Sequence, residues 1–134
     1  MAERILAVDD EPHILRLIQI NLERAGYTVE LAKDGREALQ KIADAPPDLV
    51  VLDVMMPYLD GFEVLRTLKR DPATRDLPVI MLTAKASDAD VMAGWMDGVH
   101  CYLTKPFNPP ELLNFVRRIL RGEQEETGER RIRI

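Results

Sequence analysis

Side chains that could handle a metal ion or a phosphoryl group stand at the ends of four apolar segments. Asp9 and Asp10 follow "RILAV", and Asp53 follows "DLVVL". Thr83 follows "LPVIML", and Lys105 follows "CYLT". Three carboxylates placed together repel one another, so such a cluster requires a cation. Mg²⁺ binds a small number of hard oxygen ligands from the protein, and the pattern therefore favours a magnesium site.

A carboxylate next to a bound cation can attack phosphorus and form an acyl phosphate. The charge that builds up during phosphoryl transfer is neutralised by the metal and by lysine. We therefore interpret Asp53 as the nucleophile and Lys105 as a second cation. Thr83 can donate its hydroxyl to a phosphoryl oxygen, and the backbone N–H of Ala84 can assist.

Each of these residues also has an ordinary explanation when taken singly. Acids at a helix start cap the helix and favour its dipole, which would account for one residue among Asp9, Asp10 and Glu11. A single Asp53, Thr83 or Lys105 after a strand is more often structural or solvated. Their coincidence at four strand ends favours a shared site.

The elements that must position these residues alternate along the chain. Short apolar runs predict strands, and amphipathic stretches between them predict helices. This alternation predicts a parallel sheet covered by helices on both faces, with its ligand site beyond the carboxyl ends of the strands. The expected strands are Arg4–Val8, Tyr27–Ala32, Asp48–Leu52, Leu77–Leu82 and Cys101–Thr104, and the expected helices are Pro12–Ala25, Asp34–Ala45, Gly61–Arg70, Ser87–Asp97 and Asn108–Arg121.

Composition limits the possible classes of protein. The 134 residues, 46% hydrophobic and 31% charged, fit one globular domain. A net charge of −5 argues against direct nucleic-acid binding. The single cysteine, Cys101, excludes an internal disulfide and suits a reducing compartment. No signal peptide or membrane-spanning run is apparent, so we expect no membrane insertion and a cytoplasmic location.

Four motifs in order, "LAVDDEP", "DLVVLDVMMPYLDGFEVL", "PVIMLTAK" and "GVHCYLTKPF", resemble the receiver domain of two-component response regulators. The resemblance covers roughly residues 4 to 121. It implies a receiver domain over residues 1–121 with a flavodoxin-like (βα)5 fold, a three-layer sandwich whose five-stranded parallel sheet has the order 2-1-3-4-5. Residues 122–134 are a charged tail, read either as a helix extension or as a disordered end.

The resemblance also implies roles for individual residues. Asp53 would be the phosphoacceptor, Asp10 a direct Mg²⁺ ligand and Asp9 a ligand acting largely through water. Asp53 and the backbone carbonyl of Met55 would complete the metal site.

The remaining roles concern the response to phosphorylation. Lys105 would bind the phosphoryl group, with a cis peptide bond between Lys105 and Pro106. Thr83 and Tyr102 would be the switch pair. The domain itself would catalyse only its own Mg²⁺-dependent phosphorylation and slow dephosphorylation, so it is not expected to be an enzyme in the usual sense.

The implied partners are a sensor histidine kinase or a histidine phosphotransfer protein, and a downstream target or output domain. The chain is either a single-domain regulator or part of a longer protein. "GVHCY" departs from the family's usual alanine and acid after the glycine. This segment adjoins the face of residues 87–97, 101–104 and 108–121, through which a homodimer could form.

Two other classes of protein remain open. A phosphohydrolase with an aspartyl nucleophile would need a second aspartate two residues on, where Met55 stands. A protein-interaction module of the same fold that is not phosphorylated would have lost some of the acids, Thr83 or Lys105, and all are present.

Overall fold

The structure is a computed structural model, which describes residues 2–83, 99 and 101–122. Within these residues, apolar strands alternate with amphipathic helices as the sequence predicts. The strands are β1 (Arg4–Val8), β2 (Thr28–Ala32), β3 (Leu49–Asp53), β4 (Val79–Thr83) and β5 (Cys101–Thr104). The helices are α1 (Pro12–Arg24), α2 (Gly35–Asp44), α3 (Gly61–Arg70) and α5 (Pro109–Leu120).

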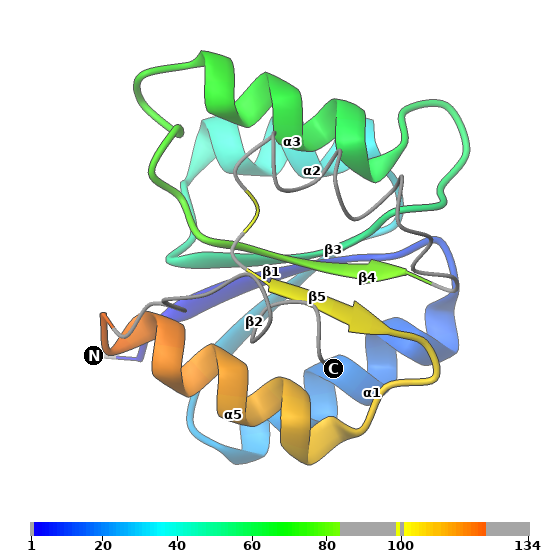
Figure 1. Cartoon of the computed structure of the whole chain (residues 1–134), viewed down its shortest axis with the longest axis vertical. Helices are drawn as coiled ribbons and strands as arrows, with labels where there is room; N and C mark the ends of the chain where they lie inside the picture. The colour runs from blue at the N-terminus through cyan, green and yellow to red at the C-terminus, as the bar shows by residue number, and fades with distance from the viewer. Residues whose placement is uncertain (1, 84–98, 100, 123–134) are drawn as a thin grey trace.

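The five strands form one parallel sheet in the order β2-β1-β3-β4-β5. Helices α2 and α3 cover one face, and α1 and α5 cover the other (Figure 1). The predicted three-layer fold and strand order are confirmed. Because β1 and β3 lie side by side in the middle of the sheet, the ends of these two strands meet at its centre.

Each sheet face packs into its own apolar core. Alternate strand residues such as Leu6 and Val50 belong to the core shared with α2 and α3, whereas Ile5 and Val51 belong to the core shared with α1 and α5. Every residue of β3 is buried, as expected of a central strand covered on both sides. The end of β3 is therefore held firmly between two layers of side chains.

Local sequence signals set the helix ends. Gly26, with φ of 100°, ends α1 in a Schellman motif: its N–H donates to the Glu23 carbonyl and that of Tyr27 donates to the Leu22 carbonyl. Asp60 and Glu63 form a capping box at the start of α3. These signals end α1 before β2 and begin α3 directly after the loop that follows Asp53.

The bounds of three strands differ from the prediction. β2 and β3 each begin one residue later than expected, at Thr28 and Leu49. β3 extends to Asp53, and β4 runs from Val79 to Thr83 instead of beginning at Leu77. Leu77 N–H donates to the Thr74 carbonyl in a turn, and Pro78 has no N–H to contribute to the ladder. Asp53 and Thr83 are therefore the last residues of their strands.

Other expectations fall outside the residues that the structure describes. The predicted helix Ser87–Asp97, the backbone N–H of Ala84 and the tail beyond Gly122 all lie there. No helix in the described part of the chain is both long enough and apolar enough to cross a bilayer.

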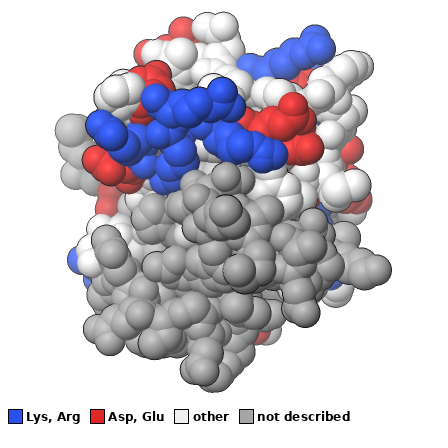
Figure 2. Space-filling model, turned by 45° about the horizontal axis from the view of Figure 1, so that its top comes forward, with Lys and Arg blue, Asp and Glu red and all other residues white. Residues whose placement is uncertain are grey.

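Lysine and arginine side chains gather on the surface over α3 (Figure 2). Lys69 and Arg70 stand in the last turn of this helix, where cations favour the helix dipole. The Lys69 ammonium donates to the carbonyls of Arg75 and Leu77, at 2.9 and 3.4 Å. At least part of this basic surface therefore holds the connection from α3 to β4.

Gly61, the first residue of α3, lies against the backbone of the residue that ends β3. A Cβ atom at this position would be 2.4 Å from the Asp53 carbonyl oxygen and 2.9 Å from Val54 Cα. The Gly61 N–H also donates to the Val54 carbonyl, at 2.9 Å. Only glycine allows α3 to begin this close to Asp53.

We expect Gly61→Ala to lower the melting temperature, because the added methyl group meets backbone atoms that cannot move aside freely. Overpacking of this kind costs roughly 1–3 kcal/mol or more. Circular dichroism melting curves provide the measurement, with Thr67→Ala on the exposed side of α3 as the control. Equal melting temperatures for both variants would show that a side chain fits between the start of α3 and the backbone of Asp53, and would contradict the prediction.

Candidate functional site

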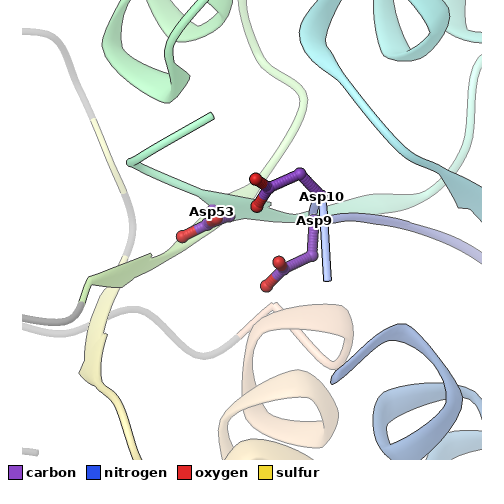
Figure 3. A group of neighbouring side chains, drawn as sticks. All are labelled: Asp9, Asp10 and Asp53. Carbon is purple, nitrogen blue, oxygen red and sulfur yellow. The ribbon is translucent and has the colours of Figure 1, made fainter. Parts of the chain in front are cut away.

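Three carboxylates meet at the carboxyl edge of the sheet. Asp9 lies directly beyond β1, where its N–H extends the ladder to the Ala32 carbonyl at 3.1 Å. One oxygen each of Asp9, Asp10 and Asp53 lies within 4.8 Å of the others. Figure 3 shows the three side chains coming from the ends of β1 and β3 toward a shared space. Asp9 and Asp53 are buried, and Asp10 is exposed.

Lys105 is the cation that faces these acids. Its Nζ lies 2.8 Å from Asp9 Oδ2 and 3.2 Å from Asp53 Oδ1. Its backbone N–H donates to the Thr83 carbonyl at 2.7 Å, and its peptide bond to Pro106 is cis. The side chain is only 13% exposed. The predicted lysine therefore belongs to the acid cluster and is not a free surface charge.

Burial and charge shift two pKa values in the cluster. Burial raises the pKa of Asp53 to about 6, with a further contribution from the Asp9 charge and an opposing one from Lys105. Burial alone would lower the pKa of Lys105, but the contacts with Asp9 and Asp53 outweigh it, and that pKa is raised. Lys105 therefore stays protonated, whereas the Asp53 carboxylate is held in a charged state that its surroundings disfavour.

The donor set fits a divalent cation. Asp9 Oδ2 is buried and has no hydrogen bond of normal geometry, although Lys105 Nζ is near it. Among the residues that the structure describes, the Lys105 ammonium faces Asp9 and Asp53 while Asp10 adds a third carboxylate, so negative charge is in excess there. Carboxylate oxygens with an exposed member, Asp10, are suited to Mg²⁺, which keeps several of its waters. The residues present could therefore hold a magnesium ion.

The remaining predicted site residues lie around this cluster. Thr83 ends β4 and is buried. Tyr102 is also buried, within the core on the α2 and α3 side of the sheet. Met55 follows β3 in the loop to α3, and its side chain is 71% exposed. The Met55 side chain therefore lies largely in solvent and does not pack in the core.

One residue of the cluster was not predicted as a site residue. Glu11 Oε1 lies 3.6 Å from Lys105 Nζ, and Glu11 Oε2 lies 3.4 Å from His13 Nε2. Glu11 is the N-cap residue of α1, yet its side chain makes no capping hydrogen bond. Its backbone N–H instead donates to Asp9 Oδ1 at 2.9 Å, which fixes that carboxylate. The sequence signal for it was a third acid directly after Asp9 and Asp10.

The family model described as "Response regulator receiver domain" matches residues 5–117. The chain belongs to the response regulator receiver family. Receiver domains are signalling modules of two-component systems and not conventional enzymes, and the acid cluster of Asp9, Asp10 and Asp53 is typical of their magnesium site.

Curated relatives of this receiver include longer regulators. It is 49% identical over 124 residues to the alkaline phosphatase synthesis transcriptional regulatory protein PhoP of Bacillus subtilis, covering 92% of this chain and 51% of that protein. It is 48% identical over 118 residues to the DNA-binding dual master transcriptional regulator RpaA of Synechocystis, covering 88% and 49%. The receiver spans about half the length of these relatives.

Solved structures agree with the fold of the receiver. A putative response regulator from Chloroflexus aurantiacus has a TM-score of 0.86 and 37% identity, covering 90% of this chain and 99% of that one. The BeF3-activated DrrB receiver domain has a TM-score of 0.82 and 35% identity, covering 90% and 99%. The strand ends that form the cluster therefore belong to a known receiver architecture.

We expect Asp53→Asn to stabilise the metal-free receiver at neutral pH. The Asp53 pKa is raised to about 6 in the folded state, whereas an unfolded aspartate titrates near pH ~4. The wild-type chain therefore loses stability as pH rises from ~4 to ~6, on the order of 3 kcal/mol in total, and the amide variant does not show this loss.

Melting curves in EDTA at several pH values provide the measurement. The variant should melt a few degrees higher at pH ~7.5, and the difference should shrink toward zero at pH ~4. A difference that stays constant over this pH range, or a variant that is less stable at neutral pH, would contradict the assignment of buried charge to Asp53.

Proposed function

We propose that this receiver accepts a phosphoryl group on Asp53 from a phosphohistidine donor. The observation that carries the proposal is the convergence of Asp53, Asp9, Asp10 and Lys105 at one edge of the sheet. An Asp53 carboxylate oxygen forms a bond to phosphorus while the bond from phosphorus to the donor imidazole nitrogen breaks. The imidazole leaves with the electron pair, and Asp53 becomes an acyl phosphate.

The sheet presents Asp53 as a nucleophile with little freedom to move. β3 is hydrogen-bonded on one side to β1 and on the other to β4, and Asp53 itself pairs with Leu82. Asp53 is only 2% exposed. A reacting group held on a rigid strand keeps its geometry without ordering at the moment of reaction.

Mg²⁺ is the proposed cofactor, held by the carboxylates of Asp10 and Asp53 and the Met55 backbone carbonyl, with Asp9 acting largely through water. When bound, the ion neutralises the charge that develops on the phosphoryl oxygens. The excess of carboxylates over ammonium groups supports this assignment. Binding of the ion would also offset the burial and the Asp9 charge that raise the pKa of Asp53.

Lys105 and Thr83 would bind the transferred group. The Lys105 ammonium is shared between Asp9 and Asp53, so it can exchange one partner for another without movement of β5, which ends at the preceding residue. Thr83 ends the strand next to β3 and can donate its hydroxyl to a phosphoryl oxygen. The backbone N–H of Ala84 is a third proposed donor.

Thr83 and Tyr102 would couple phosphorylation to the surface. Met81 pairs with Tyr102 between β4 and β5, and Thr83 is two residues beyond Met81. Because side chains alternate along a strand, Thr83 and Tyr102 lie on the same face of the sheet. Tyr102 is already buried in this structure, so the switch would act by moving or retaining a ring inside the core. The phosphoryl group shifts the two states only by its differential interaction with them.

The donor would be a sensor histidine kinase or a histidine phosphotransfer protein in the cytoplasm. The names of these relatives, which are transcriptional and DNA-binding regulators, suggest a downstream output that acts on DNA. The net charge of −5 suggests that any DNA contact belongs to the output region and not to the receiver. A homodimer would form through β5, α5 and the predicted helix at 87–97.

We expect one phosphoryl group to be added to Asp53 during incubation with acetyl phosphate and Mg²⁺. Intact mass spectrometry measures the product, and both EDTA and Asp53→Asn should abolish it. Asp48→Asn, an exposed acid at the opposite end of β3, is the matched control and should react normally. Equal mass gain in the Asp53→Asn protein would assign the phosphoacceptor to another residue.

We expect the Tyr102 ring to respond to beryllofluoride through Thr83. NMR spectra of the free and beryllofluoride-treated receiver should show changed ring and backbone shifts at Tyr102, and Thr83→Ala should remove most of this change. Thr67→Ala, an exposed threonine on α3, serves as the control. Tyr102 shifts that persist unchanged without the Thr83 hydroxyl would separate the two residues and contradict a coupled switch.

A further inference from the structure

The loop between β3 and α3 contains a strained tyrosine. Tyr58 has a φ of 70°, in the left-handed region that bulky side chains rarely adopt. The Leu59 N–H donates to the Pro57 carbonyl at 2.9 Å, closing a three-residue turn around Tyr58. Three-residue turns with positive φ at the centre are rare and strained. Something outside the turn must therefore stabilise this conformation.

Burial of the ring does not supply that stabilisation, because Tyr58 is 74% exposed. The guanidinium of Arg36 instead lies over the ring, with Cζ 4.7 Å from its centroid. A cation over an aromatic face at this distance is attracted by the ring. The contact joins the loop to α2, which belongs to a different part of the chain.

The position of Arg36 within α2 is itself unfavourable. Arg36 is the second residue of the helix, where the dipole favours acids and disfavours cations. Its neighbour Gly35 packs so closely on the loop that a Cβ atom would be 2.7 Å from the Leu59 carbonyl oxygen. Two consecutive residues of α2 therefore contact the turn around Tyr58, and Arg36 stands where the dipole of its own helix disfavours a cation.

The loop is also fixed at its other end. The Gly61 N–H donates to the Val54 carbonyl at 2.9 Å, and the capping box of Asp60 and Glu63 begins α3. Met55, whose carbonyl is a proposed metal ligand, lies between this anchor and the turn. The path of the backbone at Met55 thus depends on how the turn is held against α2.

We infer that Arg36 and Tyr58 form a clasp that positions the β3–α3 loop, and with it the Met55 carbonyl, for metal binding. Both are positioning residues, since neither is part of the acid cluster. The inference rests on the proposed Mg²⁺ site. It also implies that metal binding and the first turn of α2 are coupled, and such coupling is reciprocal by thermodynamic linkage.

Mg²⁺ affinity of the complete chain provides the test, measured by isothermal titration calorimetry in Arg36→Gln, Tyr58→Ala and the double variant. We expect the dissociation constant to rise about 3- to 10-fold in each single variant, and no further in the double variant, because residues acting through one contact are not additive. Tyr58→Phe retains the aromatic face and should bind as wild type does.

The direction of the change in Mg²⁺ affinity in Arg36→Gln distinguishes loss of the contact with Tyr58 from loss of a positive charge. Removing a positive charge should by itself strengthen cation binding slightly, and the control Arg16→Gln, on the exposed side of α1, measures that effect. Weaker binding in Arg36→Gln alone therefore points to the clasp. Unchanged or tighter binding in Arg36→Gln and in Tyr58→Ala would overturn the inference.

NMR spectra distinguish a failure of this inference from a failure of the proposed function. In the wild-type chain, Mg²⁺ should shift the amide signals of Gly35 and Arg36, and Tyr58→Ala should lose these shifts while retaining those of Asp10 and Asp53. Wild-type Mg²⁺ binding with no signal change at α2 would overturn the clasp and leave the metal site intact. A wild-type chain that binds no Mg²⁺ would overturn the metal site itself.

Discussion

An excess of negative charge at the carboxyl edge of the sheet, among the residues that the structure describes, is the constraint on which the rest of the structure depends. Asp9 and Asp53 are buried, Asp10 stands beside them, and Lys105 provides the ammonium that faces Asp9 and Asp53. Burying charges without full compensation opposes folding. The same imbalance makes the edge receptive to a metal ion, so the feature that weakens the apo domain is the one that suits its chemistry.

The apolar core makes this arrangement sustainable. β1, β3 and β4 are almost entirely buried, and their alternate residues fill two separate cores. The hydrophobic stabilisation of these strands is large compared with the unfavourable free energy of the few acids at their ends. Strand pairing also removes most of the freedom of Asp53. Stability from the core and strain at the edge are thus two consequences of placing an acid at the end of a buried strand.

Much of this could be predicted because it depends on local and periodic signals. Alternating apolar runs and amphipathic stretches indicate a parallel sheet, and the acids, Thr83 and Lys105 at the strand ends indicate the site. Strand boundaries were less predictable. Asp53 and Thr83 continue β3 and β4 because they pair with residues of the neighbouring strands. A polar residue after an apolar run does not reveal this pairing. The departure of Leu77 from β4 depends on a turn bond to Thr74 that no periodicity reveals.

The features that were not predicted arise from contacts between distant segments. Glu11 has the residue type and position of an ordinary N-cap, but its side chain approaches Lys105, which is distant in sequence. Tyr58 in "MPYLDG" gives no sign of a positive φ, because the favourable contact with Arg36 comes from another helix. Single residues in unfavourable local conformations or positions persist only when tertiary contacts stabilise them. Tyr58 and Arg36 are residues of this kind, and their mutual contact lies beside the loop that follows Asp53.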